Sequence, residues 1–337
     1  MKKSFENVFI SISLVFSILV ISLIFTGCKK TENPIKFPKG IFPDTTIILS
    51  EINSSYDDFN TALYHLCGYT SLIFSSNRGS SGGQFDLVQG LMSFDFDQTN
   101  ADFALEVEIA EDAFISKLIA AANTPGNDFG PYQLFSTVDG FEYLLLSSVN
   151  SNGNLDFYFL KNFPVFGTPL PDVLGPYPVK LLNTNSDDVY ISLDTNQDTA
   201  YYSSNVEGNF EIFLKSKSSE TPLDAWFNGD YSPGTKVDSL NSTSEDMCPF
   251  VFRKAMVFAS DRPGGLGGYD LYYSIFRNGK WSTPVNFGPD VNTSSDEYRP
   301  VIGTNSDFQN NFMIFSSNRP GGQGGYDLYF RGVTFPK

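Results

Sequence analysis

The sequence predicts an all-β fold, a five-bladed β-propeller, because one segment recurs five times along the 337 residues. The two most similar copies are MVFASDRPGGLGGYDLYYS from Met256 and MIFSSNRPGGQGGYDLYFR from Met313. Weaker copies begin at Leu72, Leu144 and Ala200. Short apolar runs that alternate with glycine-rich turns at a fixed period are typical of β-strands arranged radially as blades.

The spacing of the copies sets the number of blades and locates one insertion. Aligned on their second small residue, the copies are 72, 56, 56 and 57 residues apart (Ser76, Ser148, Ser204, Ser260, Ser317). The longer first step predicts roughly 15 extra residues between Leu91 and Asn123, and residues 111–123 have the apolar spacing of a helix. We expect this helix at the rim of the propeller.

Each repeat predicts the strands of one blade in order. An acidic turn leads to an inner strand, and an apolar run such as residues 72–74 or 313–315 follows, as in a strand covered on both faces. A loop of Gly, Asn and Ser then leads to a third strand that begins with Asp or Glu. An outer strand follows, as at residues 280–285, where a proline is tolerated at a sheet edge.

The last repeat has no outer strand of its own, because the chain ends soon after Phe330. We expect residues of about 40 to 50 to supply that strand to the blade that contains Asp327, which would close the ring and protect an exposed edge. The predicted organisation is a signal peptide over residues 1–27, a tether over 28–39 and a propeller over 40–335.

Composition excludes several classes of function. The chain carries 38 Asp and Glu against 22 Lys and Arg, a net charge of −16, which argues against nucleic acid and anionic lipid surfaces as partners. His65 is the only histidine, and no CxxC, HExxH or GxSxG motif occurs. We therefore assign no catalytic residue and expect no cofactor, and we leave a metal ion open.

The N-terminus predicts export. Met1-Lys2-Lys3 precede the apolar residues 8–25, and Gly27-Cys28 follow closely. This pattern resembles a bacterial lipoprotein lipobox, with Phe25 where leucine is usual, and the resemblance implies a lipidated Cys28 that anchors the chain in the cell envelope, at the outer membrane. An uncleaved membrane anchor is the alternative, because the apolar stretch is long for a signal. Cys67 and Cys248 lie in non-adjacent repeats, so we expect free buried thiols.

The repeat also resembles a known family. The pattern SSNRPGGxGGYDLY, preceded by N-x-S-x-[DE]-[DE], is similar to the WD-repeat-like propeller repeats of the TolB type, over residues of about 50 to 330. Such repeats also occur beside OmpA-like domains in bacterial envelope proteins. TolB itself has six blades, and no OmpA-like domain is found in this sequence, so the resemblance does not imply peptidoglycan binding. It implies an envelope propeller with a protein partner.

One acidic residue recurs at the same position in all five turns that precede the inner strands (Asp58, Asp128, Asp188, Asp246, Glu297). Because inner strands line the central channel, we expect these acids at its mouth. Crowded carboxylates there would raise one another's pKa or bind a cation. Alternatively, each acid caps its own turn by accepting hydrogen bonds from backbone N–H groups.

The glycine-rich loops carry Arg78, Arg262 and Arg319, in repeats that become neighbours once the ring closes. These arginines are candidate interface residues in an otherwise acidic protein. A phosphate-binding loop is excluded, because the loops lack the Lys-Ser/Thr pair and lead into a strand. The alternative is that the arginine and the strand Asp hold the loop in place.

Three functions remain open. The main hypothesis is a lipid-anchored, non-catalytic module that binds an envelope protein. The alternatives are a ligand- or cation-binding propeller that uses the acidic ring, and a glycan-active enzyme, because five-bladed propellers include glycoside hydrolases with carboxylates at the channel mouth. The sequence leaves the partner and the oligomeric state undetermined.

We predict that Cys28→Ser abolishes lipidation, so that the protein stays unprocessed or becomes soluble in the periplasm. Metabolic labelling with a fatty acid, followed by membrane fractionation, measures both effects. Unchanged processing and membrane association in the variant would contradict the lipoprotein interpretation.

Overall fold

The computed structural model describes residues 35–66, 69–163 and 170–336, so the export signal, Cys28 and Cys67 lie outside the described residues. Two compact units are present. The larger comprises Lys39–Phe96 and the chain from Phe103 onward, and the smaller includes residues 97–102, where the carbonyl oxygen of Gln98 accepts hydrogen bonds from two backbone amides of its own unit. Within the described residues, no helix is long and apolar enough to cross a membrane.

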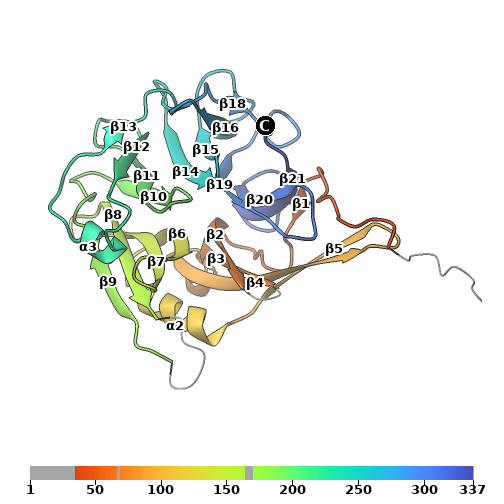
Figure 1. Cartoon of the computed structure of the whole chain (residues 1–337), viewed down its shortest axis with the longest axis horizontal. Coiled ribbons are helices and arrows are strands. Elements are labelled where there is room, and N and C mark those ends of the chain that lie inside the picture. Colours follow the sequence, from red (N-terminus) through yellow and green to blue (C-terminus); the bar gives the residue numbers. More distant parts are fainter. Residues whose placement is uncertain (1–34, 67–68, 164–169, 337) are drawn as a thin grey trace, which may run out of the picture. The chain divides into compact units, whose positions relative to one another are not determined.

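The larger unit is a five-bladed β-propeller, as the sequence predicts (Figure 1). Blade 1 contains β2 (Asp58–Leu66), β3 (Tyr69–Ser76), β4 (Asp86–Asp97) and β5 (Asp102–Ile109), from the axis outward. Blade 2 contains β6 (Asp128–Phe135), β7 (Glu142–Val149), β8 (Leu155–Asn162) and β9 (Leu174–Pro178). Blade 3 contains β10 (Asp188–Leu193), β11 (Thr199–Ser204), β12 (Glu211–Ser216) and β13 (Thr235–Lys236). Blade 4 contains β14 (Asp246–Phe252), β15 (Ala255–Ser260), β16 (Asp270–Arg277), β17 (Lys280–Trp281) and β18 (Val285–Asn286).

Blade 5 is closed by the N-terminal segment, which confirms the predicted strand exchange. It contains β19 (Glu297–Gly303), β20 (Asn311–Ser317), β21 (Asp327–Val333) and the edge strand β1 (Ile47–Ile48). In the antiparallel pair, Ile47 lies opposite Phe330 and Ile48 opposite Tyr329. The strand is shorter than expected because a turn begins directly after it, where the carbonyl oxygen of Leu49 accepts the amide of Ile52 at 3.1 Å.

The extra residues of the first repeat lengthen β4 and β5 of blade 1 and add the helix α2 (Ala113–Ala122), which confirms the predicted helix. The carboxylate of Asp112 caps the helix by accepting the backbone amides of Phe114 (3.0 Å) and Ile115 (3.2 Å). Ile115 and Leu118 are buried in a cluster with apolar residues of blades 1 and 2. The helix therefore covers the outside of these two blades.

The five inner strands share one backbone geometry where they approach the axis of the propeller. Each inner strand has a register shift of the bulge type near its start, and a residue with positive φ lies there in all five blades (Asn60, Gly130, Tyr190, Cys248, Arg299). A Cβ on Gly130 would lie 2.5 Å from the ring of Tyr190, so this position requires glycine for space as well as for φ. We call these five positions the axis ring.

The asparagine of each acidic turn fastens its blade to the third strand of the preceding blade. In every case the side-chain oxygen accepts the backbone N–H (2.7–2.9 Å) and the side-chain amide donates to the backbone carbonyl (2.9–3.1 Å) of a single residue. The pairs are Asn53–Leu328, Asn123–Leu87, Asn183–Phe157, Asn241–Ile212 and Asn292–Leu271. We call these pairs the asparagine clamps.

We predict that Asn292→Ala lowers the free energy of unfolding by about 1–3 kcal/mol, because the buried N–H of Leu271 loses its partner and the carbonyl oxygen of Leu271 keeps only the amide of Phe287. Urea denaturation followed by fluorescence measures the change. The control is Asn152→Ala, at an exposed turn residue. A stability loss in Asn292→Ala no greater than in the control would contradict the role of the clamp.

Candidate functional site

The five repeat-encoded acids are buried, and each binds its own turn. The carboxylate of Asp58 accepts the backbone amide of Ser54 at 2.6 Å and its hydroxyl at 2.7 Å. The backbone amide four residues before the acid makes the same contact in the other four blades (Asp128, Asp188, Asp246, Glu297). All five side chains are fully buried. The structure thus places each acid in a capping position within its turn.

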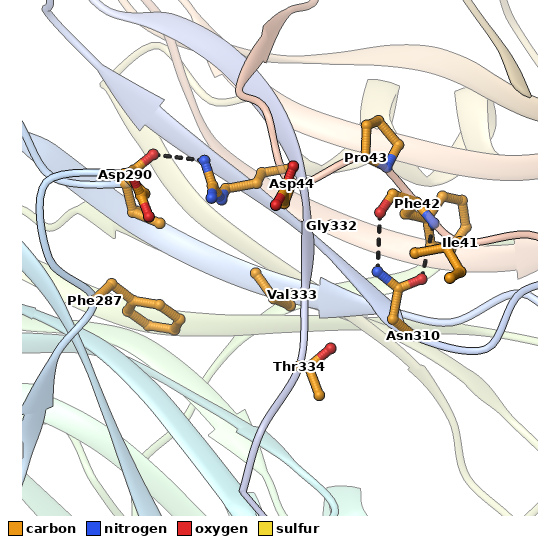
Figure 2. A pocket seen from close by; sticks show the side chains of 12 residues that line it. Ile41, Phe42, Pro43, Asp44, Phe287, Asp290, Asn310, Gly332, Val333 and Thr334 are labelled. Atoms are coloured by element: carbon orange, nitrogen blue, oxygen red, sulfur yellow. Dashed lines mark hydrogen bonds between the residues drawn. The ribbon is translucent and has the colours of Figure 1, made fainter.

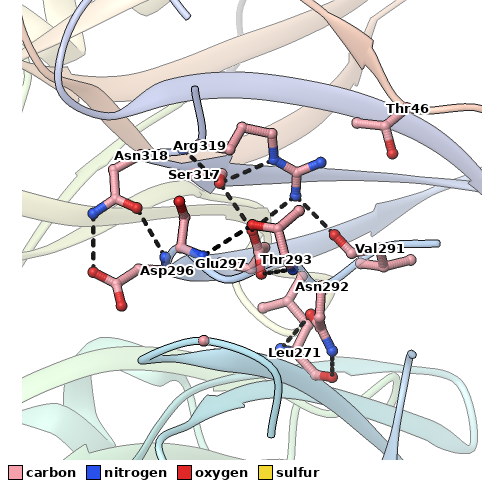
Figure 3. Close-up of polar contacts among 12 residues, drawn as sticks. Thr46, Leu271, Val291, Asn292, Thr293, Asp296, Glu297, Ser317, Asn318 and Arg319 are labelled. Carbon is pink, nitrogen blue, oxygen red and sulfur yellow. Dashed lines mark hydrogen bonds and ion pairs between the residues drawn. The ribbon is translucent and has the colours of Figure 1, made fainter. Parts of the chain in front are cut away.

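The arginines of blades 1, 4 and 5 neutralise the acids of the same blades. Figure 3 shows Arg319, whose Nη2 lies 2.9 Å from Glu297 and 2.7 Å from the carbonyl oxygen of Val291. Its guanidinium also packs over the rings of Phe315 and Tyr329, with centroid distances of 5.2 and 4.9 Å. Arg78 pairs with Asp58 and Arg262 with Asp246 in the same way. These three side chains are mostly buried and hold the glycine-rich loops.

Blades 2 and 3 depart from this pattern because their loops lack the arginine. Asn150 and Val206 occupy the equivalent positions. Without a cation, burial raises the pKa of Asp128, and it raises the pKa of Asp188 to about 6 against hydrogen bonds from Ser204 and Thr184 that lower it. The charge compensation seen in the other three blades is therefore missing here.

Two carboxyl groups meet at the junction of blades 2 and 3. Asp156 is the second residue of β8 in blade 2. The backbone amide of Leu155, directly before it, donates to the carboxylate of Asp187 at 2.9 Å, and Asp187 directly precedes Asp188 of blade 3. Burial raises the pKa of Asp156, and the charge of Asp156 in turn raises the pKa of Asp188. The Oδ1 atoms of both are buried and have no hydrogen-bond partner among the residues that the structure describes. We call them the Asp156–Asp188 pair.

The pKa of Asp188, raised to about 6, lets this pair hold a proton at a pH where an ordinary carboxyl group is ionised. Two interacting carboxyl groups titrate as a unit, so one of them keeps its proton while the other ionises. Asp156 is half-buried and Asp188 fully buried, so Asp156 is the member that solvent reaches. Within the described residues, no group of three or more Asp, Glu, His or Cys side chains is arranged to hold a metal ion.

Half-buried aromatic rings surround the start of the inner strands. Three are phenylalanines (Phe59, Phe85, Phe129) and three are tyrosines (Tyr269, Tyr298, Tyr326). Phe59 contacts Phe129 of blade 2 at a centroid distance of 5.7 Å and stacks on Tyr326 of blade 5 at 5.7 Å. The hydroxyl of Tyr326 donates to Asp296 at 3.0 Å. We call these six rings the aromatic mouth.

The sequence analysis missed the aromatic mouth, although a signal was present. An aromatic residue recurs directly before the acid of the third strand, as at Phe85, and directly after the acid of the turn, as at Phe59. In blade 2 the position before the third-strand acid is Leu155. The third-strand acid of the Asp156–Asp188 pair is therefore preceded by a residue that is not aromatic.

A pocket of about 550 Å³ lies at the seam where the N-terminal segment closes the ring (Figure 2). Asn310 binds the backbone amide and the carbonyl oxygen of Phe42, at 2.8 and 3.0 Å. Arg331 donates to the carbonyl oxygen of Asp290 at 2.6 Å. Because these polar groups satisfy backbone groups of the seam, the pocket is explained by ring closure.

The chain is similar in structure to several glycoside hydrolases. A thermostable family-43 glycoside hydrolase matches with a TM-score of 0.51 and 13% identity, over 83% of this chain and 90% of that one. The endo-arabinase of Bacteroides thetaiotaomicron matches with a TM-score of 0.52 and 12% identity, over 87% and 98%. The α-L-arabinofuranosidase of Podospora anserina, solved with cellotriose, matches with a TM-score of 0.52 and 10% identity, over 90% and 99%. No protein-family model and no curated protein match the sequence.

At this level of identity the likeness establishes the fold, and it corrects two expectations from the sequence. The similarity to TolB-type repeats is wrong as an assignment, because the structural neighbours named above are five-bladed glycoside hydrolases. The same neighbours contradict the non-catalytic interaction module and favour the alternative of a glycan-active enzyme. The turn motif that suggested the TolB-type family consists of residues that form contacts between blades. It therefore indicates a propeller fold and does not identify a family.

The missing arginine predicts opposite effects for two matched substitutions. The pKa of Asp188 is raised in the folded state, so its stabilising effect is full below pH 4 and is lost as the pH rises to about 6. At pH 7.5 we therefore expect Asp188→Asn to stabilise the protein by about 2–3 kcal/mol. Asp246→Asn should destabilise it by about 2–4 kcal/mol, because Arg262 loses its partner.

Urea denaturation at pH 4.5 and pH 7.5 measures both variants. The gain from Asp188→Asn should shrink at the lower pH, where the wild-type carboxyl is protonated. If Asp188→Asn destabilises the protein at pH 7.5 as much as Asp246→Asn does, a compensating cation must neutralise Asp188 and the account of this site is wrong.

Proposed function

We propose that this propeller is a glycoside hydrolase that acts on arabinose-containing glycans. The observation that carries the proposal is the structural similarity to an endo-arabinase and an α-L-arabinofuranosidase over 87–90% of this chain. The similarity spans nearly the whole of those enzymes, 98% and 99% of their chains. The proposal thus concerns the complete propeller and not one blade.

Hydrolysis of a glycosidic bond needs a carboxylic acid with a raised pKa, because the leaving oxygen must receive a proton. Asp156 fits this role, since burial raises its pKa and it is the solvent-accessible member of the Asp156–Asp188 pair. Asp188, whose pKa is raised to about 6 by burial and by the charge of Asp156, titrates together with Asp156 and acts as a positioning residue.

The aromatic mouth supports binding of a sugar chain. Binding sites for small molecules combine apolar and aromatic walls with a few polar groups that fix orientation. The rings of Phe59, Phe129 and Tyr326 offer flat apolar surfaces for the C–H faces of sugars. The Tyr326 hydroxyl and the Asp296 carboxylate add polar groups at the same place.

The place of action follows from the N-terminus and is likewise a proposal. The lipobox-like sequence that ends in Cys28 supports attachment to the outer membrane of a bacterial cell envelope. A hydrolase tethered in this way would act on glycans that reach the envelope.

The test is the release of reducing sugar from arabinan by the purified protein and by two matched variants. We expect the wild type to be active and Asp156→Asn to lose activity by about 100-fold or more, because a general acid contributes that much. Asp86→Asn is the control, since Asp86 lies opposite Ser76 in blade 1 as Asp156 lies opposite Ser148 in blade 2. It should keep most of the activity.

Two results would contradict the proposal. If the wild type releases no sugar from arabinan or arabinoxylan, the chain is no hydrolase of such glycans. If Asp86→Asn loses as much activity as Asp156→Asn, the loss reflects the strand-start position, and the assignment of the proton donor is wrong.

A further inference from the structure

The centre of the propeller contains a buried arginine that crosses the axis. Arg299 belongs to blade 5, yet its Nη2 donates to the carbonyl oxygen of Pro131 in blade 2 at 3.1 Å. Its guanidinium carbon also lies 5.2 Å from the centroid of the Tyr190 ring in blade 3. Neither blade is a ring neighbour of blade 5, and the side chain is fully buried. The guanidinium therefore lies in the central channel.

This guanidinium has no anionic partner among the described residues. No Asp or Glu there lies within the 4.0 Å of an ion pair with it, in contrast to Arg78, Arg262 and Arg319. Its Nε and Nη1 atoms are buried and have no hydrogen-bond partner in the described part of the chain. The side-chain oxygen of Asn60, another axis-ring residue, is also buried without a partner.

The neighbouring side chains cannot neutralise the charge by losing a proton. The titratable groups that interact most with Arg299 are one thiol and three phenols (Cys248, Tyr190, Tyr298, Tyr132). Burial raises the pKa of Cys248 to about 12 and the pKa of each phenol above its ordinary range. They stay neutral at physiological pH, while a guanidinium stays protonated in proteins.

A buried charge without a partner is strongly destabilising. Since the described residues provide no counter-charge for this guanidinium, we expect it to come from solution. From these contacts we infer that the central channel binds a small monovalent inorganic anion, such as chloride, on Nε and Nη1 of Arg299. The aromatic rings of Tyr190 and Tyr298 pack at 5.7 Å from each other beside the site. A sugar acid or a peptide carboxylate would have to displace them, which favours a bare halide.

The anion site does not use the Asp156–Asp188 pair, although Tyr298 of the aromatic mouth lies beside it. Asp156 and Asp188 lie at the junction of blades 2 and 3, whereas the anion would contact the axis-ring residue Arg299 of blade 5. Loss of the anion would therefore reduce stability, and loss of the Asp156–Asp188 pair would reduce catalysis.

Bromide provides a direct test on the unmodified protein. Crystals grown without chloride and soaked in sodium bromide should show an anomalous peak within hydrogen-bonding distance of Arg299 Nε or Nη1. Only water density at that place, with no anomalous signal, would overturn the inference.

Thermal unfolding tests the same site in solution, with sodium gluconate replacing sodium chloride at constant ionic strength. Each tenfold rise in chloride above the dissociation constant should raise Tm by on the order of 2 °C, because the anion binds only the folded state. Arg299→Met should abolish the rise and exposed Arg253→Met should keep it. An equal rise in the wild type and in Arg299→Met would assign the effect to another site and overturn the inference.

Discussion

The asparagine clamp is the contact on which the propeller depends. Each clamp satisfies one N–H and one C=O of the third strand in the preceding blade, and all five blades make it, including the pair Asn53–Leu328 that joins the first blade to the last. A blade packs face to face with its neighbours, so the N–H is cut off from water and has the asparagine oxygen as its partner, while the C=O in four of the five pairs also accepts a backbone amide. The turn acid accepts the backbone amide of the residue four positions before it. This hydrogen bond fixes the turn that carries the clamp asparagine.

The sequence predicts most of this fold because the residues that build it recur. The repeat spacing gives five blades, the unpaired last repeat predicts closure by the N-terminal segment, and the apolar spacing of residues 111–123 predicts α2. The short helix α3 (Leu223–Phe227) shows the limit of such patterns, because it lies between the third and outer strands of blade 3 and has no counterpart in the repeat. Pro222 directly precedes that helix, and proline suits a helix start better than a paired strand.

The candidate site could be predicted only in part, because function lies where the repeat is broken. The positions of the turn acids are evident in the sequence, but the direction of their side chains follows from the folded turn. The axis ring has no repeat signature, since its five residues differ in every blade. The charge balance also differs between blades: three turn acids have an arginine partner and the acids of blades 2 and 3 have none. Asp156 and Asp188 thus occupy repeat positions but lack the arginine of the other blades, and Arg299 occupies a position with no repeat signature.

A crystal structure of the Asp156→Asn variant with an arabino-oligosaccharide tests the central claim most directly, because it locates the ligand without relying on turnover. The account predicts sugar density across the aromatic mouth, with a glycosidic oxygen within hydrogen-bonding distance of residue 156 at the junction of blades 2 and 3. Sugar bound only in the seam pocket beside Arg331, or no sugar at a concentration that supports hydrolysis by the wild type, would contradict it.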